Sequence, residues 1–203
     1  TFVQDDAHIF CTEAQIHDEV SLVLDQIFET YRAFGFNDVH VELSTKPAKA
    51  IGSAETWTKS EAILQKVLED KEINYTLNPG DGAFYGPKID FHIKDSLNRS
   101  WQCGTCQLDF SMPERFELEY TGEDGGSHRP VMLHRAVVGS LERFMGILVE
   151  NYAARMPVWL APIQVKVIPI ADRHEDYAQN IVKALKAAGI RVEANWKNDK
   201  IGQ

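Results

Sequence analysis

The chain has 203 residues, of which 44% are hydrophobic and 25% are charged, as expected for a globular protein with one full core and part of a second. No run of about 18 apolar residues occurs and the N-terminus lacks the order of a signal peptide, which argues against a membrane partner and favours a cytoplasmic protein. The net charge of −9 counts against nucleic acid as a partner of the whole chain, although residues 162–203 carry 7 Lys and Arg against 5 Asp and Glu.

The first segment, QDDAHIFC at residues 4–11, gathers two carboxylates, a histidine and a thiol. Three interpretations stay open for it: metal ligands, an acid–base pair, or a polar lead-in to the helix that follows. That helix is well defined in the sequence. Thr12 and Gln15 have the spacing of a capping box, and apolar residues then recur at helical spacing until Gly35 ends the run.

A second helix is predicted over residues 53–71, because Ser53 can cap it and apolar residues lie along one face. Period-two segments joined by short turns indicate an antiparallel sheet, and the last of them runs straight into a helix after Gly139. The predicted fold class of this part is therefore α+β. The segments are VHVEL (39–43), NYTLN (74–78), IDFHIK (89–94), WQCGTCQLDF (101–110) and VMLHRAVV (131–138).

The segment MPVWLAP, residues 156–162, contains two prolines and no periodicity, which is typical of a linker. Beyond it, IQVKVIPI predicts a strand buried on both faces, residues 172–188 an amphipathic helix ended by Gly189, and IRVEANW a second strand. Together they form a βαβ unit. The expected boundaries are residues 1–156 for the first domain, 157–162 for the linker and 163–203 for an incomplete second domain.

The pair Cys103 and Cys106 has the C-x-x-C form, which in isolation indicates zinc binding or thiol redox chemistry. A redox motif normally opens a helix, whereas this pair lies in an alternating strand, where the two side chains are expected on opposite faces. Three cysteines, an odd number, also argue against a disulfide framework. A structural role is therefore favoured over redox chemistry.

Three further features each leave two interpretations open. His8 and His134 are far apart in sequence, and each taken alone is more typical of an ordinary histidine than of a ligand. The glycine-rich segment GDGAFYGPK is either a hairpin turn or a place where the backbone and Lys88 approach an anion. Arg143 lies on the first turn of a helix, where a cation opposes the helix dipole, so it either holds an anion or a base or is simply solvated.

Taken together, QDDAHIFC, GDGAFYGPKIDF, WQCGTCQLDF and VMLHRAVVGSLERF, in this order and with these gaps, resemble the threonyl-tRNA synthetase family of class II aminoacyl-tRNA synthetases. The resemblance covers essentially the whole chain. It implies a class II antiparallel sheet with flanking helices, followed by a truncated α/β anticodon-binding domain. Motif 1 and most of motif 2 have no counterpart here, so the chain is expected to be a fragment that is inactive alone.

The resemblance implies ATP-dependent activation of L-threonine to threonyl adenylate and its transfer to tRNA(Thr), with Zn²⁺ selecting the amino acid. His8 and His134 match two zinc ligands, and the third, a cysteine, lies outside the chain. Asp6 matches the acceptor of the threonine hydroxyl, Lys88 a residue near the α-phosphate, and Arg143 the motif 3 arginine that faces ATP. Matches that line the amino-acid pocket or the substrate face are Gln4, Tyr85, Gln102, Thr105 and Gln107.

The resemblance also implies Mg²⁺ bound with ATP, a homodimer for the full-length enzyme, and a core position for Cys11. The alternative function is a catalytically inactive synthetase-like protein that binds RNA or has a regulatory role. The joint presence of His8, His134, Asp6, Lys88 and Arg143 favours the enzyme, because a binding protein does not need them all. A thiol oxidoreductase is a distant third.

Overall fold

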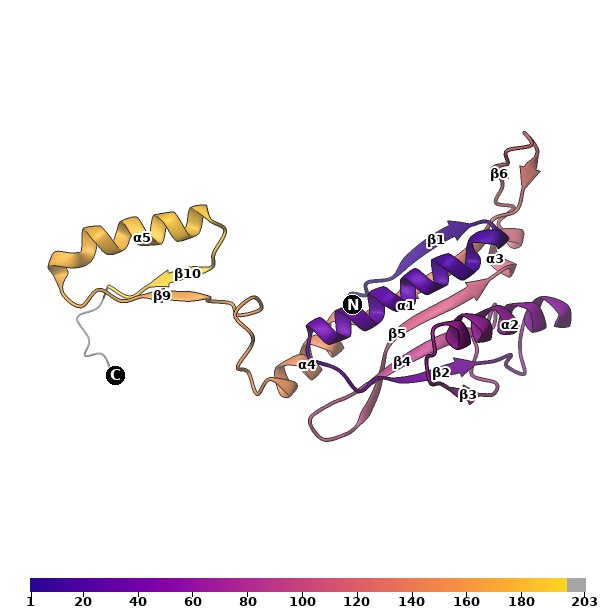
Figure 1. Ribbon diagram of the computed structural model, residues 1–203, viewed down its shortest axis with the longest axis horizontal. Helices are drawn as coiled ribbons and strands as arrows, with labels where there is room; N and C mark the ends of the chain where they lie inside the picture. Colours follow the sequence, from indigo (N-terminus) through magenta and orange to yellow (C-terminus); the bar gives the residue numbers. More distant parts are fainter. Residues whose placement is uncertain (197–203) are drawn as a thin grey trace. The chain divides into compact units, whose positions relative to one another are not determined.

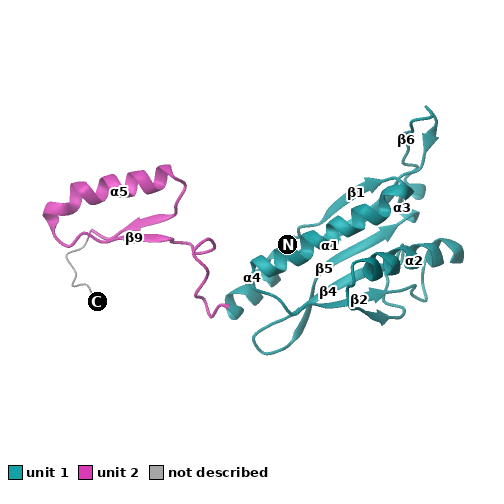
Figure 2. Cartoon of the chain, in the orientation of Figure 1, with its two compact units in different colours: residues 1–151 teal, residues 152–203 magenta. Residues whose placement is uncertain are grey.

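The chain divides into two compact units, residues 1–151 and 152–203 (Figure 2), and the computed structural model describes residues 1–196. The first unit is built on a six-stranded sheet with the order β1-β8-β5-β4-β2-β3. Neighbours in this order are antiparallel except for β2 and β3. The strands are β1 (Ala7–Cys11), β2 (His40–Ser44), β3 (Thr76–Asn78), β4 (Lys88–Lys94), β5 (Ser100–Asp109) and β8 (Val131–Ala136).

The two predicted N-terminal helices form and are capped as their sequences indicate. The side chain of Gln15 accepts a hydrogen bond from the Thr12 N–H at 2.9 Å, and the Ser53 hydroxyl accepts one from the Thr56 N–H at 3.1 Å. These bonds satisfy N–H groups that have no partner inside a helix. The helices of this unit are η1 (Glu13–Gln15), α1 (Ile16–Ala33), α2 (Ala54–Asp70), α3 (Ser111–Arg115) and α4 (Leu141–Asn151).

The core lies between these helices and one face of the sheet (Figure 1). On α1, Phe28 meets Phe91 of β4 edge to face, with 5.6 Å between the ring centroids. Tyr31, also on α1, stacks near Phe144 of α4 and donates a 2.8 Å hydrogen bond to the carbonyl of Val137. The apolar positions of the strands are buried against α1, so the positions that alternate with them face away from the helices.

The segment that leads into α1 contains the strand β1, which the sequence analysis did not predict. Its pairing with β8 is held by the carboxylate of Asp5, which accepts backbone N–H bonds from Val137 at 2.7 Å, Val138 at 3.2 Å and Gly139 at 2.9 Å. Local periodicity over so short a segment is weak. The strand is specified by its partner rather than by its own sequence.

The pairing of β2 with β3 is parallel, so the prediction of a wholly antiparallel sheet is wrong at this edge. The helix α2 lies between the two strands in the chain and returns it to the starting end of the sheet. Parallel neighbours need a crossover of this kind, whereas antiparallel neighbours need only a turn. The α+β fold class itself is confirmed, with a mixed sheet and flanking helices.

The second unit pairs β9 with β10 in parallel, connected through α5, as the βαβ pattern predicts. The prediction that its first strand is buried on both faces is wrong, because Val165 and Val167 are partly exposed and Ile170 is 80% exposed. In the described part of this unit one helix covers one face of a two-stranded sheet. Its elements are β9 (Val165–Val167), η2 (Asp172–His174), α5 (Glu175–Ala187) and β10 (Val192–Ala194).

A short hairpin, β6 (Tyr120–Thr121) with β7 (Ser127–His128), extends away from the sheet between α3 and β8 (Figure 1). Among the helices that the structure describes, none has the length and apolar character needed to cross a membrane.

Gly86, in the loop before β4, tests how closely that loop must approach β5. A Cβ added there would overlap the backbone oxygen of Leu108 and lie 3.0 Å from its carbonyl carbon. We expect Gly86→Ala to lower the free energy of unfolding by about 1–3 kcal/mol, because backbone cannot yield as a flexible side chain does. Urea unfolding followed by circular dichroism measures the change.

Gly146 is the matched control, because it lies inside α4 and an added Cβ there meets nothing within 4 Å. Gly146→Ala is expected to leave the stability unchanged or raise it by up to about 1 kcal/mol. Wild-type stability in Gly86→Ala would show that the loop moves freely and does not position its neighbours.

Candidate active site

The face of the sheet that the helices leave uncovered carries polar side chains from adjacent strands. Register places Lys88 opposite Gln107, Asp90 opposite Thr105, and Gln107 opposite His134. Directly opposite residues project to the same face, and residues two apart along a strand do so as well. Antiparallel pairing therefore gathers these five side chains from three strands onto one surface.

This polar face is hollowed into a cavity of about 160 Å³. Six of the residues that the resemblance singled out line it, contributed by the N-terminal segment, the loop before β4, and strands β5 and β8. They are far apart in sequence and converge only through the strand order. The lining residues are Gln4, Asp6, Tyr85, Thr105, Gln107 and His134, together with Arg135 and Ala136.

The two histidines are brought into direct contact by the pairing of β1 with β8. His8 lies opposite His134 in the register, and their ring centroids are 4.6 Å apart with the rings at 74°. His134 also lines the cavity that Asp6 lines, whereas His8 is exposed at its side. The sequence spacing gives no reason to pair these two histidines, because 125 residues lie between them in the chain.

Asp109 is a site residue that the sequence analysis missed. Its side chain is fully buried, and its Oδ2 lies 2.8 Å from Nε2 of His134. Its Oδ1 accepts the backbone N–H groups of Ser111 at 2.7 Å and Met112 at 2.9 Å. Asp109 ends β5 just before a short helix, a position where an aspartate that accepts nearby backbone N–H bonds is common. That local signal did not reveal its contact with His134.

Tyr85 closes the cavity next to His134, with 4.9 Å between the ring centroids, and its hydroxyl donates to Oε1 of Gln107. Burial raises the pKa of Tyr85 to about 12, and the charges of Asp109 and Asp6 act in the same direction. The phenol therefore stays protonated at neutral pH and remains a hydrogen-bond donor.

A second missed carboxylate, Asp90, holds together the residues on the β4 side. Its exposed fraction is 1%, and its two oxygens accept hydrogen bonds from four side chains. Lys88, which also pairs with Asp81 at 3.2 Å, is one of the four. The four donors are Ser44 (2.8 Å), Gln102 (2.6 Å), Thr105 (3.0 Å) and Lys88.

Arg143 lies apart from the cavity that His134 lines. Its guanidinium is 5.7 Å from the ring centroid of Trp101, and its Nη1 donates to the carbonyl of Gln102 at 3.1 Å. It lines a different hollow of about 200 Å³, together with Asp95 and Trp101. The structure thus separates Arg143 from the two histidines and places it over an aromatic ring, where a cation is favoured.

The three thiols are free and buried, and burial raises the pKa of Cys103 to about 11 and of Cys106 to about 12. The strict alternation that predicted opposite faces for the pair does not hold. Gly104 pairs with Phe91 while Gln102 pairs with His92, so a bulge inserts Cys103 as an extra residue. High thiol pKa values are the opposite of what a redox cysteine pair needs.

Two neighbouring imidazoles are a donor set that zinc can use, and they would make up part of a site. Two imidazoles meet edge to face, and one is held from behind by a buried carboxylate, as is usual for a metal-bound histidine. Zinc takes three or four protein ligands. The described residues contain no group of three or more His, Cys, Asp or Glu side chains that could hold a metal.

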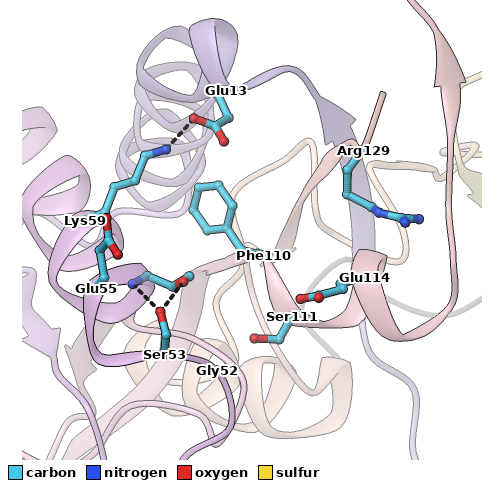
Figure 3. Close-up of a pocket in the computed structure, with 10 residues that line it drawn as sticks. Glu13, Gly52, Ser53, Glu55, Lys59, Phe110, Ser111, Glu114 and Arg129 are labelled. Atoms are coloured by element: carbon cyan, nitrogen blue, oxygen red, sulfur yellow. Dashed lines mark hydrogen bonds and ion pairs between the residues drawn. The ribbon is translucent and has the colours of Figure 1, made fainter. Parts of the chain in front are cut away.

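A larger cavity of about 720 Å³ lies at the starts of η1 and α2 (Figure 3). Lys59 and Glu13 form an ion pair beside Phe110 at its edge, and Ser53 caps α2 within it. The residues predicted for the active site do not line it. The chemistry of the sequence motifs therefore points to the smaller cavity on the polar face.

Comparison with known proteins agrees with this architecture. Residues 1–152 match the family described as tRNA synthetase class II core domain (G, H, P, S and T), and residues 164–203 match the family described as anticodon binding domain. The chain therefore belongs to the class II aminoacyl-tRNA synthetase family.

Within that family its relatives are threonine–tRNA ligases, as the sequence motifs predicted. It is 58% identical over 201 residues to that of Syntrophomonas wolfei, and 59% identical over 200 residues to that of Desulforamulus reducens. These alignments cover 99% and 98% of this chain but 32% and 31% of the relatives, so the chain spans about a third of their length.

A solved structure described as the RNA binding domain of threonyl-tRNA synthetase from Cryptosporidium parvum Iowa II has the same fold. It superposes with a TM-score of 0.93 at 42% identity and covers 98% of this chain and 50% of that one.

The buried thiols lead to a labelling prediction. Alkylation requires the thiolate, and a pKa of about 11 leaves only about one thiol in a thousand ionised at pH 8. We expect Cys11, Cys103 and Cys106 to resist iodoacetamide in the native protein and to react fully in urea. Mass spectrometry of the labelled peptides measures each site. Rapid native labelling of Cys103 and Cys106 would revive the redox interpretation.

Proposed function

We propose that this chain supplies the amino-acid selection part of a threonine–tRNA ligase, which activates L-threonine with ATP to threonyl adenylate and transfers it to tRNA(Thr). The observation that carries the proposal is a cavity on the polar face that both Asp6 and His134 line, with His8 in contact with His134. Family membership and the threonine–tRNA ligase relatives support the same assignment.

In this proposal His8 and His134 hold Zn²⁺ with a third ligand from outside the described residues. Zinc held by these residues would supply a Lewis acid for the amino group and β-hydroxyl of threonine. Asp6 accepts the hydrogen bond of that hydroxyl, while Gln4 and Tyr85 shape the pocket around the amino acid. A site built to bind a hydroxyl rejects valine, because valine leaves its polar groups without partners.

Activation then depends on positioning and charge. Asp90 holds Lys88, Gln102 and Thr105 on the polar face, where Lys88 can neutralise the threonine carboxylate and the α-phosphate. Arg143, with Mg²⁺ on the phosphates, would orient ATP from the neighbouring hollow. In-line attack of the carboxylate on the α-phosphorus forms the acyl phosphate bond and releases pyrophosphate, a reaction that ordered charges accelerate.

The match of residues 164–203 to an anticodon-binding family supports tRNA as a partner, through the less acidic end of the chain. A homodimer of the full-length enzyme and a cytoplasmic location complete the proposal.

Asp6 and the zinc site act on the same substrate hydroxyl, which allows a discrimination test. Asp6→Ala should keep its zinc, because both histidines are unchanged, but lose an acceptor worth about 1.5–3 kcal/mol for a hydrogen bond to a charged group. Threonine activation should fall about 10- to 100-fold in kcat/KM, whereas the already poor activation of valine should change little. Pyrophosphate exchange with both amino acids in the full-length enzyme measures the ratio.

The control for this test is Asp18→Ala, which removes an exposed carboxylate on α1 that does not line the cavity. Its threonine-to-valine ratio should equal that of the wild type. An unchanged ratio in Asp6→Ala with full zinc content would show that Asp6 does not recognise the hydroxyl. If the wild-type enzyme shows no pyrophosphate exchange, a synthetase-like protein without catalysis is favoured.

Arg143 and the histidines are assigned to separate ligands, so their losses should separate as well. Arg143→Ala should reduce ATP-dependent pyrophosphate exchange by about 100-fold, as removal of one transition-state donor typically does, while zinc content stays at the wild-type value. Arg32→Ala is the control, because Arg32 is an exposed arginine on α1 that does not line the hollow that Arg143 lines, and its pyrophosphate exchange should equal that of the wild type. Equal loss of zinc and exchange in Arg143→Ala would mean that α4 is disrupted as a whole.

A further inference from the structure

In the hydrogen bond between Asp109 and His134, the donor and the acceptor can be assigned. A carboxylate accepts hydrogen bonds, so the 2.8 Å contact with Oδ2 places the imidazole proton on Nε2. Asp109 cannot turn away, because its Oδ1 is held by the N–H groups of Ser111 and Met112 and its side chain is fully buried. The tautomer of His134 is therefore set by a carboxylate that is itself locked by backbone.

We infer that Asp109 is the positioning residue of the zinc site, which fixes His134 as the Nε2–H tautomer and leaves Nδ1 as its only ligand atom. This inference rests on the proposed function, because it takes His8 and His134 as zinc ligands. The carboxylate also holds the orientation of the ring, which meets His8 edge to face at 4.6 Å. Ring orientation and proton position are the two properties that such partners impose on metal-bound histidines.

The same geometry makes Asp109→Asn a sharp probe. The amide has the shape of the carboxylate, and its oxygen must take the Oδ1 position, because only an acceptor satisfies the N–H groups of Ser111 and Met112. The NH₂ group then faces Nε2 of His134 and donates to it. His134 is forced to carry its proton on Nδ1, which removes the atom available to the metal.

The experiment measures Zn²⁺ binding to full-length protein by metal analysis and by competition with a chelator. Asp109→Asn is expected to weaken Zn²⁺ binding at least about 10- to 100-fold, the usual effect of removing such a partner. The thermal unfolding midpoint of the metal-free protein should stay near that of the wild type, because both backbone N–H groups keep their acceptor. A merely structural role would move the midpoint and spare the metal.

Asp90→Asn is the matched control, since Asp90 is an equally buried carboxylate on the same face with no contact to His134. It should bind Zn²⁺ like the wild type. Wild-type affinity in Asp109→Asn would overturn the inference and leave the proposed function intact. A wild-type enzyme that binds no zinc would overturn the zinc selection step and the inference with it.

A second measurement needs no variant at position 109. In metal-free wild-type protein with ¹⁵N-labelled histidine, long-range ¹⁵N–¹H spectra report which ring nitrogen carries the proton, and His134→Gln assigns the signal. We expect the proton of His134 on Nε2. A proton on Nδ1 would overturn the inference, even if Asp109→Asn fails to fold.

Discussion

The antiparallel pairing of β1 with β8 is the constraint on which the candidate site depends. It sets His8 against His134 and brings Asp6 to the cavity, and it is anchored where Asp5 accepts three backbone N–H bonds from the β8–α4 junction. A slip of one residue would turn every side chain of β1 to the other face of the sheet. The partly exposed carboxylate of Asp5 therefore fixes the register, which links the fold of the N-terminal segment to the chemistry of the site.

Two buried carboxylates organise the polar face itself. Asp90 collects Lys88, Gln102 and Thr105 on the β4 side, and Asp109 holds His134 on the β8 side. A buried charge persists only where hydrogen bonds replace its water, and every oxygen of these two carboxylates accepts at least one hydrogen bond. The residues proposed to contact the substrate are therefore held in place by buried residues that do not contact it. The site is ordered in this way before a ligand binds.

Elements with a strong local signal were predictable from the sequence. The helices that begin after Thr12 and at Ser53 have their own caps and apolar stripes, so neighbouring residues alone determine them. β1, the parallel pairing of β3 and the bulge at Cys103 were missed or mispredicted, because each depends on a partner strand. Strand pairing is a contact between distant parts of the chain, and local periodicity does not report it.

For the site, the sequence by itself determined which residue types stand in the motifs, and through their order and gaps the family to which the chain belongs. It did not determine that His8 touches His134, that Arg143 lies over Trp101, or that Asp109 and Asp90 hold their neighbours. Those facts were decided by tertiary structure alone. The physical reason is that hydrogen bonds and ring contacts act over a few ångströms in space, and only the order of strands in the sheet brings such residues within that range.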